Sequence, residues 1–182
     1  MKSLTFLLVS TPFIFWVIAC NRPEVGQGEF SLEAEPYMGS KLSLDGYYYY
    51  LDDDSEDYDL DRAIFFYRNG VILDITGATP PTSSLEELDE TIREVENSRV
   101  QSSLFRWGIF QVESDTISFE KWYPSSGGYH PVYIRAGRIL NDTTFVITES
   151  FRSDGTERRP KDETYHFRSF SPKPDSTNDF VP

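Results

Sequence analysis

The chain has few of the residues from which disulfides and soft metal sites are built. It contains one cysteine, Cys20, and two histidines, His130 and His166, among 182 residues. A single cysteine has no partner within the chain, so we expect the fold to rest on its hydrophobic core without a disulfide. Neither histidine lies at metal-ligand spacing from another soft ligand, and the sequence therefore predicts no metal site and no cofactor.

Signals for nucleophilic catalysis are also sparse. The chain contains no Gly-x-Ser-x-Gly turn. Ser118 and Lys121 match a Ser-x-x-Lys pattern, but they lie in a strand-like segment, where residues three apart point to opposite faces of the sheet. Paired carboxylates for glycoside hydrolysis stay open as an alternative in so acidic a chain, although no pattern selects a pair. We therefore predict a protein that is not an enzyme.

Basic residues are outnumbered by acidic ones. The chain has 17 Lys and Arg against 30 Asp and Glu, which gives a formal net charge of -13. The phosphate backbone of a nucleic acid would repel such a chain, so we expect no nucleic-acid partner. An anionic lipid surface offers the chain as a whole no attraction either, and attachment to a membrane would need an anchor.

The densest acidic run covers residues 52–61. Carboxylate oxygens suit calcium, but counted from Asp57 the sixth position of an EF-hand loop is Arg62 instead of glycine and the twelfth is Arg68 instead of glutamate. The sequence therefore favours a solvated hairpin loop over a dedicated calcium site, with loose divalent binding as the alternative.

Only one long hydrophobic run is present, at the N-terminus. Lys2 is followed by an apolar stretch from Leu4 to Ile18, which Pro12 interrupts. The stretch is shorter than the about 20 residues that a membrane-spanning helix needs, and its charged start is typical of an export signal. We predict a signal peptide over residues 1–19.

The residues Val17-Ile18-Ala19-Cys20 resemble the lipobox of bacterial lipoproteins, in which an aliphatic and a small residue precede a cysteine that is acylated before cleavage. The resemblance implies that Cys20 carries lipid, that palmitate labels it, and that the acyl chains hold the protein in the cell envelope membrane. Asn21 stands where an aspartate retains enteric lipoproteins at the inner membrane, which favours the outer membrane. An ordinary cleavage site and an uncleaved anchor are the alternatives.

Aromatic residues and strand-like runs dominate the rest of the chain. The 14 Phe and 11 Tyr favour a sheet over a helix bundle. Asn69-Gly70, between two apolar runs, predicts a two-residue hairpin turn. Short turns between neighbours imply antiparallel pairing. We predict eight strands, over residues 44–51, 62–68, 71–76, 104–112, 116–122, 132–140, 143–151 and 157–170.

One helix is expected after the third of these strands. Ser84 and Glu87 form a capping box. An apolar stripe follows at helical spacing, made of Leu85, Leu88, Ile92 and Val95. We expect this stripe to pack on the sheet, with docking of a partner as the alternative.

The composition at both ends of the chain differs from that of the strand-rich part. Residues 20–41 have several Pro and Gly and few apolar residues, which predicts a lipidated tether. Residues 172–182 predict a disordered tail. The folded domain is then expected over residues 42–171, as a mainly β antiparallel meander forming a small barrel or a strongly curved sheet, because closure removes exposed edges.

In this arrangement the chain resembles the lipocalin-like β-barrel lipoproteins of Bacteroidota. The resemblance lies in residues 106–110, 115–117 and 137–145 and implies a barrel, but it carries over no ligand. The chain departs from true lipocalins in two respects. It has Gly46-Tyr47-Tyr48 where they have Gly-x-Trp, and its helix follows the third strand instead of the barrel.

Aromatic residues are the candidate ligand-binding residues. A barrel mouth lined by rings would form an apolar pocket, and the rings that we expect there are Tyr47, Trp107, Phe119, Trp122, Tyr133, Phe145, Tyr165 and Phe167. The alternative is that these rings fill the interior, because an eight-stranded barrel is narrow. Arg135 and Arg138 either face a polar ligand or lie on the surface.

The sequence as a whole predicts a non-enzymatic lipoprotein that binds a small apolar ligand or a polypeptide of the envelope. A structural or assembly accessory without a ligand cavity is the main alternative, and a hydrolase has the least support.

Overall fold

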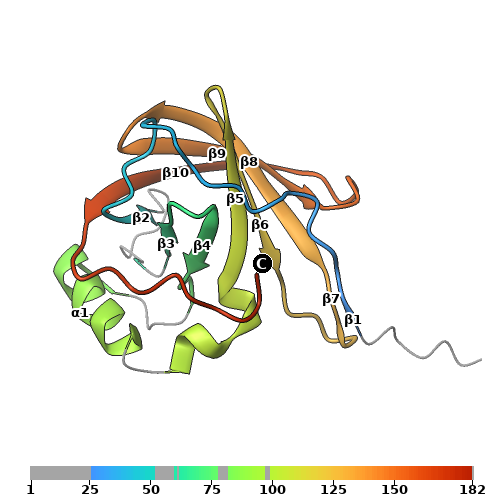
Figure 1. The fold of residues 1–182 in the computed structure, drawn as a ribbon, viewed down its shortest axis with the longest axis horizontal. Coiled ribbons are helices and arrows are strands. Elements are labelled where there is room, and N and C mark those ends of the chain that lie inside the picture. The colour runs from blue at the N-terminus through green and yellow to red at the C-terminus, as the bar shows by residue number, and fades with distance from the viewer. Residues whose placement is uncertain (1–25, 52–59, 61, 78–81, 97–98, 182) are drawn as a thin grey trace, which may run out of the picture.

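The computed structural model describes residues 26–51, 60, 62–77, 82–96 and 99–181 (Figure 1). The expected signal peptide, the lipidation site Cys20 and nearly all of the acidic run at 52–61 lie outside these residues. Within the described part of the chain, no helix is long and apolar enough to cross a bilayer.

Eight antiparallel strands close into a barrel in the order β10-β2-β3-β4-β5-β6-β8-β9. The predicted fold class is thereby confirmed, with the meander order kept and the last strand closing on the first. The barrel strands are β2 (Gly46–Tyr50), β3 (Ala63–Phe66), β4 (Val71–Asp74), β5 (Trp107–Glu113), β6 (Thr116–Trp122), β8 (Val132–Asn141), β9 (Thr144–Arg152) and β10 (Arg159–Ser169).

Two glycines allow the backbone of the barrel to turn and curve tightly. Gly70 ends the β3–β4 turn with a φ of 84°, a conformation that favours glycine, so the predicted hairpin at Asn69-Gly70 is confirmed. Its loop has three residues, 68–70, instead of the predicted two, because Tyr67 pairs with Val71. At the irregularity between β8 and β9, a Cβ on Gly137 would stand 1.8 Å from the Val146 carbonyl oxygen. Only glycine permits that approach.

The barrel interior is filled by apolar and aromatic side chains that come from all eight strands. Phe66 lies at its centre, with the rings of Tyr48, Phe110, Phe119 and Phe145 at centroid distances of 5.0–5.9 Å. All four contacts are edge-to-face, a geometry that aromatic quadrupoles prefer. This interior leaves the middle of the barrel without room for a ligand.

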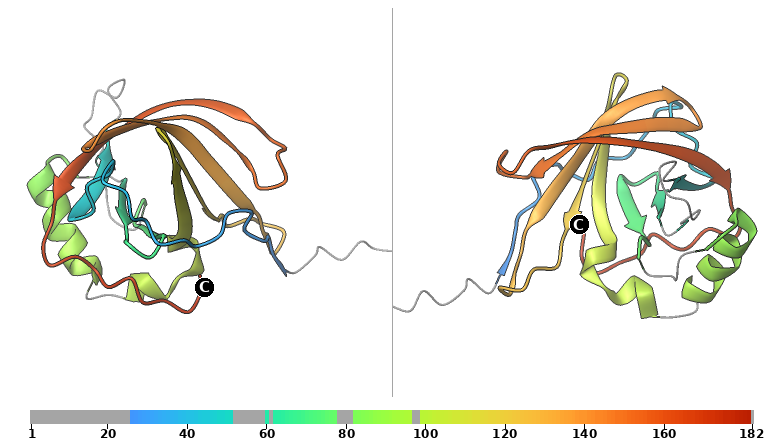
Figure 2. Two further views of the ribbon diagram at one scale, coloured as in Figure 1. Left: turned by 45° about the horizontal axis from the view of Figure 1, so that its top comes forward. Right: turned by 180° about the vertical axis from the view of Figure 1, so that it is seen from behind.

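A second core lies on the outer face of β2–β5. Alternate residues of these strands, among them Tyr47, Phe65 and Trp107, pack there beneath α1 (Leu85–Glu96) and the C-terminal segment. Figure 2 shows α1 outside the barrel wall. Strands β3 and β4 are buried on both faces for this reason, since one face points into the barrel and the other is covered.

The helix α1 begins and docks through polar contacts. Its first turn is capped by the Ser84 hydroxyl, which accepts a hydrogen bond from the Glu87 N–H at 3.2 Å. The Glu87 carboxylate returns to Ser83 instead of Ser84, at 2.9 Å from its N–H, so the reciprocal half of the predicted capping box is shifted by one residue. Leu88 and Ile92 are buried against the second core, which confirms the expected packing on the sheet.

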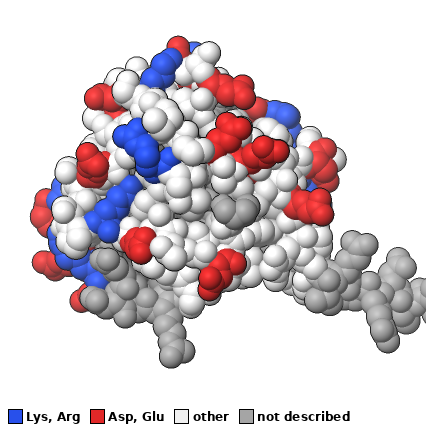
Figure 3. All heavy atoms as spheres, viewed as in Figure 1, with Lys and Arg blue, Asp and Glu red and all other residues white. Residues whose placement is uncertain are grey.

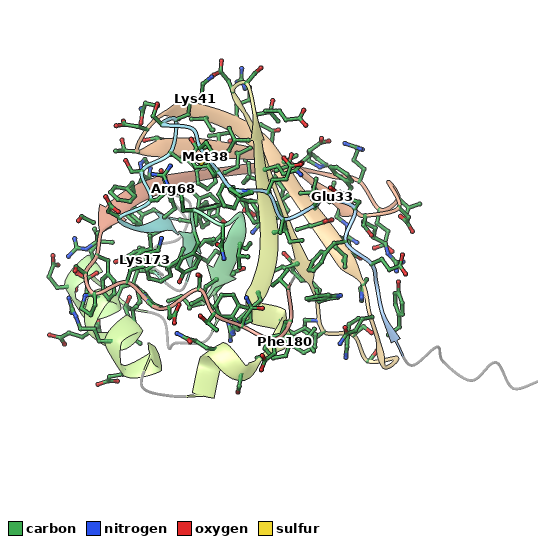
Figure 4. All side chains as sticks on the ribbon, viewed as in Figure 1. Glu33, Met38, Lys41, Arg68, Lys173 and Phe180 are labelled. Atoms are coloured by element: carbon green, nitrogen blue, oxygen red, sulfur yellow. The ribbon has the colours of Figure 1, made fainter. Side chains whose placement is uncertain are left out.

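The described part of the expected tether lies on the barrel and is not a free linker. We call residues 28–42 the strap. The rings of Phe30 and Trp122 are in tilted contact, with their centroids 4.1 Å apart, and the Gly28 carbonyl accepts a hydrogen bond from the Trp122 indole at 2.8 Å. Tyr37 and Leu42 are buried. Figure 4 shows Glu33, Met38 and Lys41 along its course over β5. The few apolar residues of the strap suffice because its polar groups also find partners in the barrel.

The described part of the expected tail is also packed. Residues 170–181 run from β10 past α1 towards the lower end of β5 (Figure 1), and Phe170 and Val181 are buried in the second core. The Lys173 ammonium donates to the carbonyls of Leu44 at 2.7 Å and Phe66 at 2.6 Å. Burial lowers the pKa of Lys173 to about 8. The folded domain is therefore longer at both ends than residues 42–171.

The remaining elements are short. The helical turns η1 (Arg99–Ser102) and η2 (Leu104–Arg106) lead into β5, and β1 (Gly26–Gln27) pairs in parallel with β7 (Tyr129–His130). The predicted start of a strand at 104 is wrong by three residues, because η2 occupies them. The β1–β7 pair fixes the N-terminal end of the strap beside the start of β8.

Candidate binding site at the barrel mouth

The aromatic residues expected to line one pocket are divided by the barrel wall. Phe119, Phe145 and Tyr165 are fully buried inside, with Phe145 and Tyr165 stacked at 4.9 Å. Phe167 belongs to the same interior cluster and contacts Tyr48. Burial raises the pKa of Tyr165 above its ordinary value. These rings fill the interior, as in the alternative that the narrow barrel favoured.

Three other candidates lie on the outer face. Tyr47 and Trp107 belong to the second core, and Trp122 packs under the strap. Tyr47 and Tyr48 show the reason. They are consecutive residues of β2, so their side chains point to opposite faces of the barrel wall, and the two rings cannot share one pocket. Of the eight rings, Tyr133 alone lines the cavity described next.

A cavity of about 390 Å³ opens at the end of the barrel where β6 ends and β8 begins. We call this end the mouth. Five strands, β4, β6, β8, β9 and β10, contribute side chains to the lining, which consists of Arg62, Asp74, Thr76, Lys121, Tyr123, Tyr133, Arg135, Ser150, Glu157, Arg159, Lys161 and Glu163. The volume lies in the range of small-molecule sites.

Two charged side chains form a buried ion pair on one wall of the mouth. Lys121 Nζ lies 2.5 Å from Asp74 Oδ2, and the two side chains are 11% and 3% exposed. Burial by itself raises the pKa of Asp74, but the Lys121 ammonium and hydrogen bonds from Thr76 outweigh it and hold that pKa below its usual range. Asp74 is therefore an ionised carboxylate and not a proton donor.

A second charged group is centred on Glu163. Arg135 pairs with its carboxylate from β8, and Arg62 and Lys161 each approach it at 3.4 Å. The Arg135 guanidinium also donates to the Tyr165 hydroxyl at 3.2 Å, which connects the charged mouth to the aromatic interior. Arg135 is thus the predicted arginine that faces the cavity, whereas Arg138 is exposed on the outer surface.

Two tyrosines form the rim. The rings of Tyr123 and Tyr133 meet edge to face at 5.4 Å, and the Lys121 ammonium lies 5.0 Å from the Tyr123 ring centroid. Tyr133 donates its hydroxyl proton to the Glu157 carboxylate. The mouth therefore combines ring faces with fixed charges, which suits a ligand with both planar and polar parts.

A second cavity, of about 450 Å³, lies between the strap and β5 and is lined by residues 35–41 and 110–114. One of its charged residues, Lys41, forms an ion pair with Asp115 of the β5–β6 turn, which is not part of the lining. Because no charged groups from several strands converge in it, this groove is a weaker candidate than the mouth.

The histidines and the Ser-x-x-Lys residues considered from the sequence are not part of a shared site. Among the described residues, no set of three or more His, Cys, Asp or Glu side chains is arranged to hold a metal ion. His130 contacts Phe105 edge to face at 4.8 Å, and His166 lies 5.8 Å from the Tyr49 ring. Ser118 and Lys121 lie on opposite sides of the barrel wall, since Lys121 faces the mouth and Ser118 is not part of its lining.

Sequence reasoning missed most of the mouth, including Asp74, Lys121 and the basic residues of β10. One signal was present: charged residues at positions 159, 161 and 163 alternate along a strand, so all three share a face. Whether that face points inward depends on closure of the barrel.

Comparison of the chain with protein-family models, with curated protein sequences and with solved structures finds no match.

Proposed function

We propose that this chain is a non-enzymatic lipoprotein of the cell envelope, anchored through lipid on Cys20 in the outer membrane, whose barrel binds a small polar ligand at the mouth. The anchor rests on the lipobox-like residues 17–20 and the apolar run before them. The binding role rests on the cavity alone.

The observation that carries the binding role is the polar cavity of about 390 Å³ above a filled aromatic interior. The mouth concentrates eight charged side chains in one concave site, and four of them, Asp74, Lys121, Arg135 and Glu163, are at most 13% exposed, where an unpaired charge would be costly. A barrel serving only as a scaffold gains nothing from holding them there.

The filled interior changes the class of ligand that we propose. An apolar ligand needs an apolar chamber, but Phe66, Phe119 and Phe145 occupy that space and are at most 1% exposed. The cavity at the mouth is lined by ion pairs and tyrosines. A polar ligand therefore suits the site better than an apolar one.

Two features of the mouth argue against acid catalysis. Its buried carboxylate Asp74 has a lowered pKa, and the Glu163 carboxylate is shared by three basic side chains. A general acid needs a raised pKa near the working pH. We therefore keep the proposal to binding.

Native mass spectrometry of the full chain, purified from the envelope in mild detergent, tests the binding role. We expect a co-purified small molecule in the parent protein. Ser150→Trp, which places a large ring on the wall of the mouth, should remove it, whereas Thr148→Trp, at an exposed position of the same strand outside the lining, should keep it. Equal ligand content in both variants would refute the mouth as the site.

Metabolic labelling tests the anchor. Palmitate should label the parent protein and not Cys20→Ala, and the variant should leave the membrane fraction. Labelling that survives the substitution would refute lipidation at Cys20.

The alternative of a structural accessory without a ligand has one observation in its favour, the solid aromatic interior. It would replace the proposal if no small molecule accompanied the parent protein.

A further inference from the structure

The charges of the mouth do not balance. Five lining residues are basic (Arg62, Lys121, Arg135, Arg159 and Lys161) and three are acidic (Asp74, Glu157 and Glu163). The described lining is thus net basic in a chain whose formal net charge is -13. The connection between β2 and β3 begins at this rim, and residues 52–59 and 61 lie outside the residues from which this balance is taken.

The excess has a definite place. Asp74 forms an ion pair with Lys121. Glu157 pairs at 3.1 Å with Arg152, which is not part of the lining. Among the described residues, Glu163 is the carboxylate that pairs with both Arg135 and Lys161. One carboxylate neutralises one cation, so the β8–β10 side of the mouth retains positive charge.

Two of the basic groups keep donors for a further partner. A guanidinium has five N–H donors, and the described residues engage two of those on Arg135, at Tyr165 and Glu163. Arg159 lines the cavity and forms no ion pair within the described part of the chain. The Arg135 side chain lines the cavity and is 13% exposed.

On the face seen in Figure 3, basic and acidic side chains are both exposed, with uncharged surface between them. Exposed mixed charges of this kind are screened by salt and water, whereas a concave wall with one sign in excess focuses its field.

We infer that the mouth binds an oxyanion, a phosphate or carboxylate group of its ligand, between Arg135, Arg159 and Lys161. The inference rests on the proposed binding role and adds the chemical class of the ligand. Planar guanidinium groups match both oxyanions through paired N–H donors. The rim rings of Tyr123 and Tyr133 then contact the uncharged part of the ligand.

Phosphate occurs in soluble molecules and in lipid headgroups, and β1 places the N-terminal end of the strap beside the mouth. The test therefore has two arms. Both use the full chain in micelles of a neutral detergent, in phosphate-free buffer, and both follow backbone amide chemical shifts.

In the first arm, inorganic phosphate is added at constant ionic strength, with chloride as the control anion. We expect saturable shifts at residues 133–135, 159 and 161–163, with a midpoint in the millimolar range, as is usual for so small a probe. The double variant Arg159→Gln, Lys161→Gln should raise that midpoint by about ten-fold, because two partly exposed charged contacts are lost. Arg158→Gln is the matched control, since Arg158 pairs with Glu149 and is not part of the lining, and it should leave the midpoint unchanged.

In the second arm, phosphatidylglycerol is incorporated into the micelles. If the oxyanion belongs to a headgroup, the same amides shift without added phosphate, and phosphate then competes. If it belongs to a soluble ligand, phosphatidylglycerol leaves them unchanged and phosphate alone shifts them. Either result supports the inference.

The inference is overturned if neither probe shifts these amides, or if the double variant binds phosphate as well as the parent does. A neutral molecule that accompanies the parent protein and is lost in Ser150→Trp would, together with silent amides, refute the oxyanion while preserving the mouth as a binding site.

Discussion

At the scale of single residues, Glu120 shows how the strap is held. Its carboxylate is fully buried outside β6 and accepts hydrogen bonds from the Leu32 N–H at 2.5 Å and the Ser31 hydroxyl at 3.1 Å. Burial raises the pKa of Glu120, and these hydrogen bonds lower it by less, so the pKa stays above its usual range. The folded protein therefore binds this proton more tightly than the unfolded chain does.

We expect Glu120→Gln to change how stability depends on pH. With a raised pKa in the folded state, the contribution of Glu120 to stability falls as pH rises through that pKa. Glutamine keeps the acceptor oxygen without the charge, so the variant should gain stability relative to the parent at pH 7.5 compared with pH 5. Urea unfolding at both values measures this difference, with the exposed strap residue Glu33→Gln as control. An equal difference at both pH values would contradict the prediction.

Phe66 is the residue on which the interior depends most directly. It contacts four other rings and is 1% exposed. We expect Phe66→Ala to lower the free energy of unfolding by about 3–5 kcal/mol, because it removes a ring and leaves a cavity that closed strands cannot collapse. Met38→Ala, at a side chain that is 83% exposed, should change it by less than about 0.5 kcal/mol. Thermal or urea unfolding gives both values, and similar losses in the two variants would refute this account of the core.

At the scale of elements, the strands and the helix could be predicted because their signals are local. The alternation of residues 116–122 and the stripe of residues 85–95 each follow from one periodicity, and β6 and α1 begin within a residue of the expected positions. The strap and the C-terminal segment could not be predicted in this way. Their positions depend on hydrogen bonds to residues far away in the sequence. Leu32 donates to the Glu120 carboxylate, and Lys173 donates to the Phe66 carbonyl.

The docking of α1 is a further element-scale feature that no local pattern shows. Asp89 accepts a hydrogen bond from the Tyr47 hydroxyl at 2.7 Å and pairs with Arg168 of β10, also at 2.7 Å. The helix thus bridges two neighbouring strands through one carboxylate.

We expect Asp89→Asn to loosen α1 without unfolding the barrel. The substitution removes the charge from the contacts with Tyr47 and Arg168, which should raise amide hydrogen exchange in α1 by about ten-fold, while β5 and β6 stay protected. Glu90→Gln, at the next and exposed position, is the matched control and should leave exchange unchanged. Faster exchange throughout the barrel would show that α1 is not a separate unit.

At the scale of the whole molecule, the net charge of the chain and the charge of the mouth have opposite signs. The formal net charge of the whole chain is -13, yet the described lining of the mouth has more basic than acidic residues. The charged residues of this lining are spread between positions 62 and 163, on β4, β6, β8, β10 and the segments beside the strands. Their convergence depends on barrel closure and on register, neither of which one sequence specifies, so the site could not be predicted although the fold could.

The strap also limits where the barrel can lie if Cys20 is acylated. Six residue steps lead from Cys20 to Gly26, which span at most about 22 Å. The strap then crosses the barrel wall over β5, from the contact of Gly28 with Trp122 at the end of β6 to that of Lys41 with Asp115 in the turn before β6. The seven residues of β6 extend over about 23 Å. The β1–β7 end is therefore held near the bilayer, and Met38 lies towards the other end.

This arrangement can be measured with single added cysteines, because an acylated Cys20 leaves no other thiol to react. Ser125→Cys places a fluorophore beside β7, and Met38→Cys places one near the opposite end. In vesicles that contain lipids with nitroxide-labelled headgroups, the fluorophore at 125 should be quenched more strongly, because quenching needs close approach to the headgroups. Stronger quenching at 38 would mean that the barrel folds back onto the bilayer by its other end. In that case the mouth would face away from the membrane, and a headgroup could not be the source of the oxyanion.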